Sequence, residues 1–459
     1  MDDAILATRI EALKRDLEWV GKGRYWLEEK LKPKPNELTD QLWGALGATI
    51  RTAAEALTDD LEEICKNVEQ GAKNGADEAQ QSLQDGWRRY AEAYQESRRI
   101  FGEYLDFIGG LALRCQGLDE RICCIADELI RKCSLEGTGS TWNSLTVIAP
   151  KESFTRTMAR IIRLRFPEWT IWALPFTAHE YGHVVLDESE RIKKILGVEV
   201  ENLAKEDERY NAADDDQARE RIKERIRKHV GVLFADAFAT FMMGPAYACA
   251  AIFLRFDPSN AGAETAEMPS DNRRALIVFK ILRRMNKEAS DRFNPIYTPV
   301  IDDLERRWRQ MIERAGATEA ISEAKRQDTE EQDAEKQGVA KWQRYEGIWE
   351  ALNPPNLLRE ARYPHKGEKE GWKKAEKWAE ELKEVLDRKR EDVQPSSTDK
   401  LRDVLNAAWL RRLKDGELWQ IEQIANAALK LCQAIIKPQH VSQQSRRGSK
   451  SGKVPQPGS

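Results

Sequence analysis

The segment LPFTAHEYGHVV, residues 174–185, holds two of the five histidines of the 459-residue chain, and a glutamate directly follows the first. On a helix, His179 and His183 would project from one face, one turn apart, so that both imidazoles can bind one metal ion. Glu180 would point about 100° away, toward a water on that ion. Chance predicts only ~0.005 such His-Glu-x-x-His matches in a chain of this composition. The segment therefore predicts a helix that binds Zn2+ through both histidines and carries Glu180 as a catalytic base.

A catalytic zinc site takes three protein ligands and a water, so a third ligand is expected elsewhere in the chain. The apolar segment 231–254 contains a single charged residue, Asp236. A carboxylate among apolar side chains is costly to bury unless a metal ion or a metal-bound histidine compensates its charge. We therefore predict Asp236 as the third metal ligand, with a supporting role behind one of the histidines as the alternative. Further alternatives for the third ligand are Glu190, Glu201 and His229.

The two segments together resemble the zincin metallopeptidases of the gluzincin type. In that family a second helix carries Glu-x-x-x-Asp, in which the glutamate binds zinc and the aspartate orients the first histidine. Here VLFADAFA, residues 232–239, keeps the aspartate as Asp236 but has Val232 at the place of the glutamate. The resemblance lies within residues 140–300. It implies a zincin-like α+β core with a small sheet, a zinc cofactor and hydrolysis of peptide bonds.

Other residues near these segments could complete a peptidase site. Zinc lowers the pKa of a bound water to about 7, and Glu180 would take the proton of that water and pass it to the leaving amine. Tyr247 of GPAY, and Arg273 or Arg274 after PSDN, could stabilise an oxyanion or bind substrate. The β-branched segment SLTVIAP, residues 144–150, is predicted to be an edge strand along which an extended peptide could add.

Helical patterns dominate the rest of the chain, and the fold class is therefore predicted to be mainly α, with helical modules on both sides of the zincin-like core. An apolar stripe at helical spacing near the amino end consists of Ile10, Leu13, Leu17 and Val20. Residues 154–166 are also predicted to be helical. The predicted organisation is a helical module, a metallopeptidase domain, a second helical module and a disordered polar tail, at residues 1–137, 138–300, 301–437 and 438–459.

Composition and charge limit the classes of partner. The net charge is −4 and the isoelectric point is about 6.0, so no nucleic-acid partner is expected. The amino end has no secretory signal, and the seven cysteines include no C-x-x-C pair and no disulfide framework. We therefore expect a cytoplasmic protein without a membrane partner. Its expected partners are a peptide or protein substrate and a regulatory protein that binds the helical flanks.

Two other interpretations fit the same segments. In the first, the chain is a non-enzymatic helical adaptor whose metal site is structural or vestigial, in line with the missing glutamate at position 232. In the second, it is an intramembrane metalloprotease, because residues 169–186 and 231–254 are both apolar and hold the two motifs. The first of these segments is only 18 residues long and contains Pro175, and Gly244–Pro245 interrupts the second. The peptidase interpretation is therefore preferred.

Overall fold

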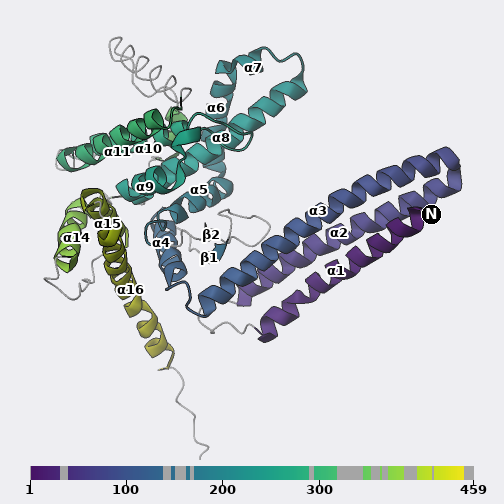
Figure 1. The fold of residues 1–459 in the computed structure, drawn as a ribbon, viewed down its shortest axis with the longest axis horizontal. Coiled ribbons are helices and arrows are strands. Elements are labelled where there is room, and N and C mark those ends of the chain that lie inside the picture. The colour runs from purple at the N-terminus through teal and green to yellow at the C-terminus, as the bar shows by residue number, and fades with distance from the viewer. Residues whose placement is uncertain are drawn as a thin grey trace, which may run out of the picture. The chain divides into compact units, whose positions relative to one another are not determined.

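The computed structural model describes residues 2–30, 40–137, 146–149, 162–165, 170–288, 294–317, 345–352, 362–363, 371–386, 401–415 and 418–448. Most of these residues are helical (Figure 1), and the predicted mainly α fold class is confirmed. The chain divides into two compact units. One consists of residues 1–123 and 143–167, and the other of residues 124–142 and 168–459.

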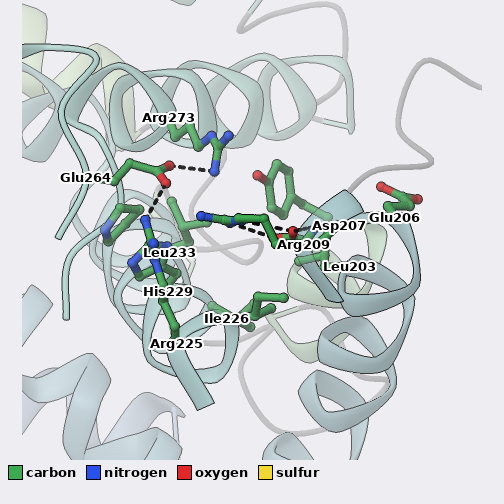
Figure 2. Close-up of a pocket in the computed structure, with 13 residues that line it drawn as sticks. Leu203, Glu206, Asp207, Arg209, Arg225, Ile226, His229, Leu233, Glu264 and Arg273 are labelled. Atoms are coloured by element: carbon green, nitrogen blue, oxygen red, sulfur yellow. Dashed lines mark hydrogen bonds and ion pairs between the residues drawn. The ribbon is translucent and has the colours of Figure 1, made fainter. Parts of the chain in front are cut away.

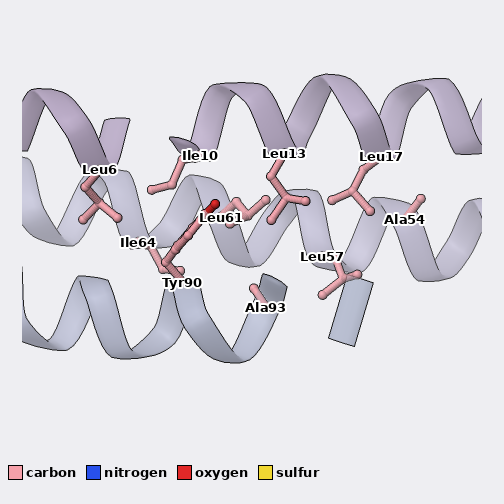
Figure 3. Packing of buried hydrophobic residues seen from close by; sticks show 10 residues of the cluster. All are labelled: Leu6, Ile10, Leu13, Leu17, Ala54, Leu57, Leu61, Ile64, Tyr90 and Ala93. Atoms are coloured by element: carbon pink, nitrogen blue, oxygen red, sulfur yellow. The ribbon is translucent and has the colours of Figure 1, made fainter. Parts of the chain in front are cut away.

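The first unit is built on three long helices that lie side by side: α1 (Asp2–Lys30), α2 (Asp40–Asn74) and α3 (Ala76–Cys115). Their apolar faces meet in a cluster of buried residues (Figure 3): Leu6, Ile10, Leu13, Leu17, Ala54, Leu57, Leu61, Ile64, Tyr90 and Ala93. Three members of the predicted stripe are therefore core residues of α1, because helical spacing places them on one face. The side chain of the fourth, Val20, lies outside the described part.

The first unit also contains a two-stranded parallel sheet formed by β1 (Thr146–Ala149) and β2 (Ile162–Arg165). β1 confirms a strand within the segment predicted to form one. The helix predicted for residues 154–166 is wrong at 162–165, where apolar residues alternate with arginine in the sequence IRLR, which is the period of a strand. The remainder of that predicted helix lies outside the described residues.

The regular elements in the described part of the second unit are all helices or helical turns. Its helices and helical turns are α4 (Ile122–Gly137, which begins at the end of the first unit), α5 (Phe176–Glu188), α6 (Glu190–Glu206), α7 (Glu208–Asn211), α8 (Asp216–Met243), α9 (Pro245–Ala250), a π-helical turn (Ala251–Arg255), a 3-10 turn (Pro258–Asn260), α10 (Asp271–Glu288), α11 (Asn294–Arg314), α13 (Glu346–Leu352), α14 (Gly371–Leu386), α15 (Leu401–Asp415) and α16 (Leu418–Gly448). α8 is central, because it packs against α5, α6, α10 and α13. Among the described residues, no helix combines the length and the apolar character needed to cross a bilayer.

α5 and α8 run antiparallel and approach closely. A Cβ added to Gly182 of α5 would lie 3.0 Å from the Ala235 Cα of α8, and a Cβ added to Gly231 of α8 would lie 3.4 Å from the Leu186 Cδ2 of α5. Residue numbers thus rise along one helix as they fall along the other. Because Gly182 has no side chain, the helix that carries both histidines packs directly on the helix that carries Asp236.

α15 holds the carboxyl end of α8. Arg402 donates a hydrogen bond to the Met242 carbonyl oxygen at 3.0 Å, and Asn406 donates one to the Met243 carbonyl oxygen at 2.8 Å. Both carbonyls lie in the last turn of α8, where the helix itself offers no donors. The C-terminal helices therefore share one compact unit with α5 and α8, whereas β1 and β2 belong to the first unit. The bounds of the two compact units differ from those of the predicted modules. In addition, α16 continues as far as Gly448, inside the segment predicted as the tail.

Candidate metal centre

α5 brings the two histidines together as its sequence predicts. The helix begins just after Pro175, and the imidazole rings of His179 and His183 lie 4.9 Å apart between centroids and 85° between planes. His179 is buried. Burial and the neighbouring His179 lower the pKa of His183 to about 3, so the His183 ring is uncharged at neutral pH and keeps a nitrogen lone pair. An uncharged imidazole is the form that binds a metal ion.

Asp236 contacts the first of these histidines from behind. Its Oδ1 atom lies 2.9 Å from His179 Nδ1, and its carboxylate is completely buried. Arg274 of α10 donates from Nε to Oδ2 at 2.8 Å and from Nη2 to Oδ1 at 3.1 Å, and the Tyr247 hydroxyl donates to Oδ1 at 2.5 Å. Burial alone would raise the pKa of Asp236, but Arg274 and His179 more than offset it and hold this pKa well below its usual range.

This contact determines what His179 can do. A carboxylate that accepts the Nδ1 hydrogen of an imidazole fixes the tautomer in which Nε2 carries the lone pair. His179 Nε2 is then the atom available for a metal ion. Both oxygens of Asp236 are engaged by Arg274, Tyr247 and His179, so the geometry favours the supporting role for Asp236 over that of third ligand.

Within the part of the chain that the structure describes, no third protein ligand joins the two histidines. Among the described residues, no group of three or more His, Cys, Asp or Glu side chains is arranged to hold a metal ion. The alternative ligands have other partners: Glu201 pairs with Lys223, Glu190 pairs with Lys193, and His229 bonds to the Thr265 carbonyl oxygen. Among the described residues, His179 and His183 are thus the two candidates for the three protein ligands that a catalytic zinc site takes.

Glu180, the predicted base, is buried and has an arginine beside it. Its Oε1 atom lies 4.0 Å from Arg255 Nη2, and the Arg255 guanidinium lies 4.0 Å above the ring of Phe176. Arg255 ends the π-helical turn, a feature often found at functional sites. Burial, with Arg274 nearby, lowers the pKa of Arg255 well below its usual range. The sequence prediction missed this residue, which stands directly after the apolar segment 231–254.

The residues that were predicted to stabilise an oxyanion or bind substrate have other side chains as partners. Tyr247 is fully buried, and its hydroxyl donates to Asp236 and lies 3.2 Å from His179 Nδ1. Burial and Asp236 raise the pKa of Tyr247 well above 10, which keeps the hydroxyl protonated. Arg274 pairs with the same carboxylate, while Arg273 pairs with Glu264 and lines a pocket to which Arg274 does not contribute (Figure 2). Tyr247 and Arg274 thus support the histidine rather than face a substrate.

Comparison with protein-family models, with curated proteins and with solved structures found no match for this chain. The functional interpretation of the centre therefore rests on its residues and their geometry.

Proposed function

We propose that this chain is a metal-dependent peptidase centred on His179, Glu180 and His183. The observation that carries the proposal is the contact between Asp236 and His179 Nδ1, because a carboxylate behind an imidazole is the usual support of a metal-binding histidine. A single buried network of Asp236, Arg274 and Tyr247 orients this ring. Burying the charges of Asp236 and Arg274 costs free energy, which a histidine with only a packing role would not require.

The roles follow from the positions of the side chains. His179 and His183 would hold zinc, which when bound supplies an activated water and polarises the scissile carbonyl. Glu180, adjacent to the first histidine, would take a proton from this water and pass it to the leaving amine. We place the substrates among peptides and proteins, and we propose that the helical flanks bind a regulatory protein.

A second candidate function is that of a non-enzymatic helical adaptor with a vestigial centre. Two observations favour it: Val232 stands where a ligand glutamate is expected, and Arg255 lies beside Glu180, where it could neutralise the base. The two functions make different predictions. A peptidase should bind zinc and should need Glu180 for hydrolysis, whereas an adaptor should not hydrolyse peptides whether or not zinc binds.

Zinc content and hydrolysis of an unfolded protein substrate distinguish these functions. We expect about one zinc per reconstituted wild-type chain, the same content in Glu180→Gln, and loss of zinc in His183→Gln. Glu180→Gln should lower hydrolysis by about 10²–10⁴-fold, because only the proton transfer is removed. Wild-type protein that takes up no zinc, or hydrolysis that is unaffected by Glu180→Gln, would contradict the peptidase and favour the adaptor.

A further inference from the structure

A second site lies in the same compact unit, away from the side chains that hold His179. It is a pocket of about 110 Å3 (Figure 2), lined by residues from α6, α7, α8 and α10, by the segment between the π-helical turn and α10, and by Asp207 and Tyr345. Three arginines from three different helices reach it: Arg209 of α7, Arg225 of α8 and Arg273 of α10. We propose that this pocket binds an oxyanion, the carboxylate or phosphate group of a small ligand.

The guanidinium groups are held in place before any ligand binds. Asp207 accepts hydrogen bonds from Arg209 Nε at 3.0 Å and from Arg209 Nη2 at 2.6 Å. Glu264 is shared by the other two arginines, with Oε2 at 3.1 Å from Arg225 Nη2 and Oε1 at 2.5 Å from Arg273 Nη1. A planar guanidinium that is fixed on one edge presents its remaining N–H groups in a defined direction, which suits a carboxylate or a phosphate.

One of these donors is unsatisfied. Arg225 Nε is buried and has no hydrogen-bond partner among the residues that the structure describes. A buried N–H without an acceptor costs free energy, and an oxyanion in the pocket would supply the acceptor. The pocket has room for a group larger than a single water. Its walls also include apolar side chains, among them Ile226, Val230 and Leu233.

Glu264 is the group that competes with the ligand. The three arginines of the pocket are balanced by three carboxylates, those of Glu206, Asp207 and Glu264, so attraction for an anion comes from directed donors more than from net charge. Glu264 sits on the segment that His229 anchors, since His229 Nε2 lies 2.9 Å from the Thr265 carbonyl oxygen. The negative charge of Glu264 repels an anion in the same pocket. Replacing this carboxylate with a neutral amide of the same shape should therefore strengthen anion binding.

Calorimetric titration of the full chain with sodium phosphate and with sodium acetate, at constant ionic strength set by sodium chloride, tests the proposal. We expect saturable binding of at least one of them, weakened at least about tenfold by Arg225→Gln. Arg227→Gln is the matched control, because Arg227 lies two residues away on α8 and pairs with Glu224 on the exposed surface. It should leave the affinity unchanged. Tighter binding of phosphate would indicate a phosphate ligand, and tighter binding of acetate a carboxylate ligand.

A variant that binds the anion more tightly provides a test that misfolding cannot imitate. Glu264→Gln should tighten binding at least about threefold, which an unfolded variant cannot do. The proposal is overturned if neither wild type nor Glu264→Gln binds either anion saturably, or if Arg227→Gln weakens binding as much as Arg225→Gln. No step of this test uses zinc or hydrolysis, so its outcome is independent of the proposed peptidase activity.

Discussion

Replacing Val232 with glutamate should raise the zinc affinity of the chain at least about tenfold, or ~1.4 kcal/mol. The antiparallel packing of α5 and α8 supplies the reason. His179 and Asp236 are in contact, and one turn further along α5 and one turn back along α8 lie His183 and Val232. Val232 thus lies one turn from Asp236 on the face of α8 that packs against α5, near the second histidine, where the longer side chain of a glutamate could reach a metal ion. A carboxylate there would add the third protein ligand that the described residues lack.

The apo form of Val232→Glu should be less stable than wild type, and zinc should reverse the difference. Val232 is 7% exposed, so a glutamate at this position would be buried without a counter-charge until a metal ion binds. A ligand that binds only the folded state stabilises it in proportion to the logarithm of its concentration over Kd. Zinc should therefore raise the melting temperature of Val232→Glu by more than that of wild type.

Val232→Gln is the matched control, since it has nearly the same shape but a neutral amide that binds zinc poorly. Competition with a chromophoric chelator would give the three affinities. Equal affinities for Val232→Glu and Val232→Gln would mean that position 232 does not face the metal. The gain should also disappear when His183→Gln is added to Val232→Glu, because the new carboxylate and the second histidine would bind the same ion.

The features that the sequence predicted well are local ones. His179 and His183 share a face because they are four residues apart on one helix, and the stripe on α1 is buried for the same reason. The burial of Asp236 also followed from the sequence, because its whole neighbourhood in the chain is apolar. Such patterns predict which side chains need a partner.

The identity of that partner could not be predicted, because packing decides it. Arg274 is 38 residues from Asp236 along the chain, and the sequence does not distinguish it from Arg273, which instead pairs with Glu264 and lines the pocket of Figure 2. Arg255 was missed for a similar reason: only the fold of the π-helical turn places it beside Glu180. The strand β2 was predicted as a helix because four alternating residues are a weaker signal than the helical pattern around them.

Arg274→Met should lower the free energy of unfolding of the second unit by about 3–5 kcal/mol, because it leaves the Asp236 carboxylate buried without its cation. Arg274 is 4% exposed and Asp236 is fully buried, so water cannot replace the lost hydrogen bonds. The adjacent Arg273 is the control: its side chain is 29% exposed, and Arg273→Met should cost about 0–1 kcal/mol. Urea unfolding followed by tryptophan fluorescence would measure both.

The double variant Asp236→Asn/Arg274→Met separates charge from packing. Removing both charges of a buried pair is often nearly neutral, so the double variant should recover much of the stability that Arg274→Met loses. Zinc affinity should not recover with it, because a neutral amide is a weaker acceptor for His179 Nδ1 and orients the ring less firmly. Loss of zinc affinity in a stable double variant would assign the network to metal binding. Unchanged affinity would show that Asp236 and Arg274 serve the fold alone, and the supporting role proposed for Asp236 would then be wrong.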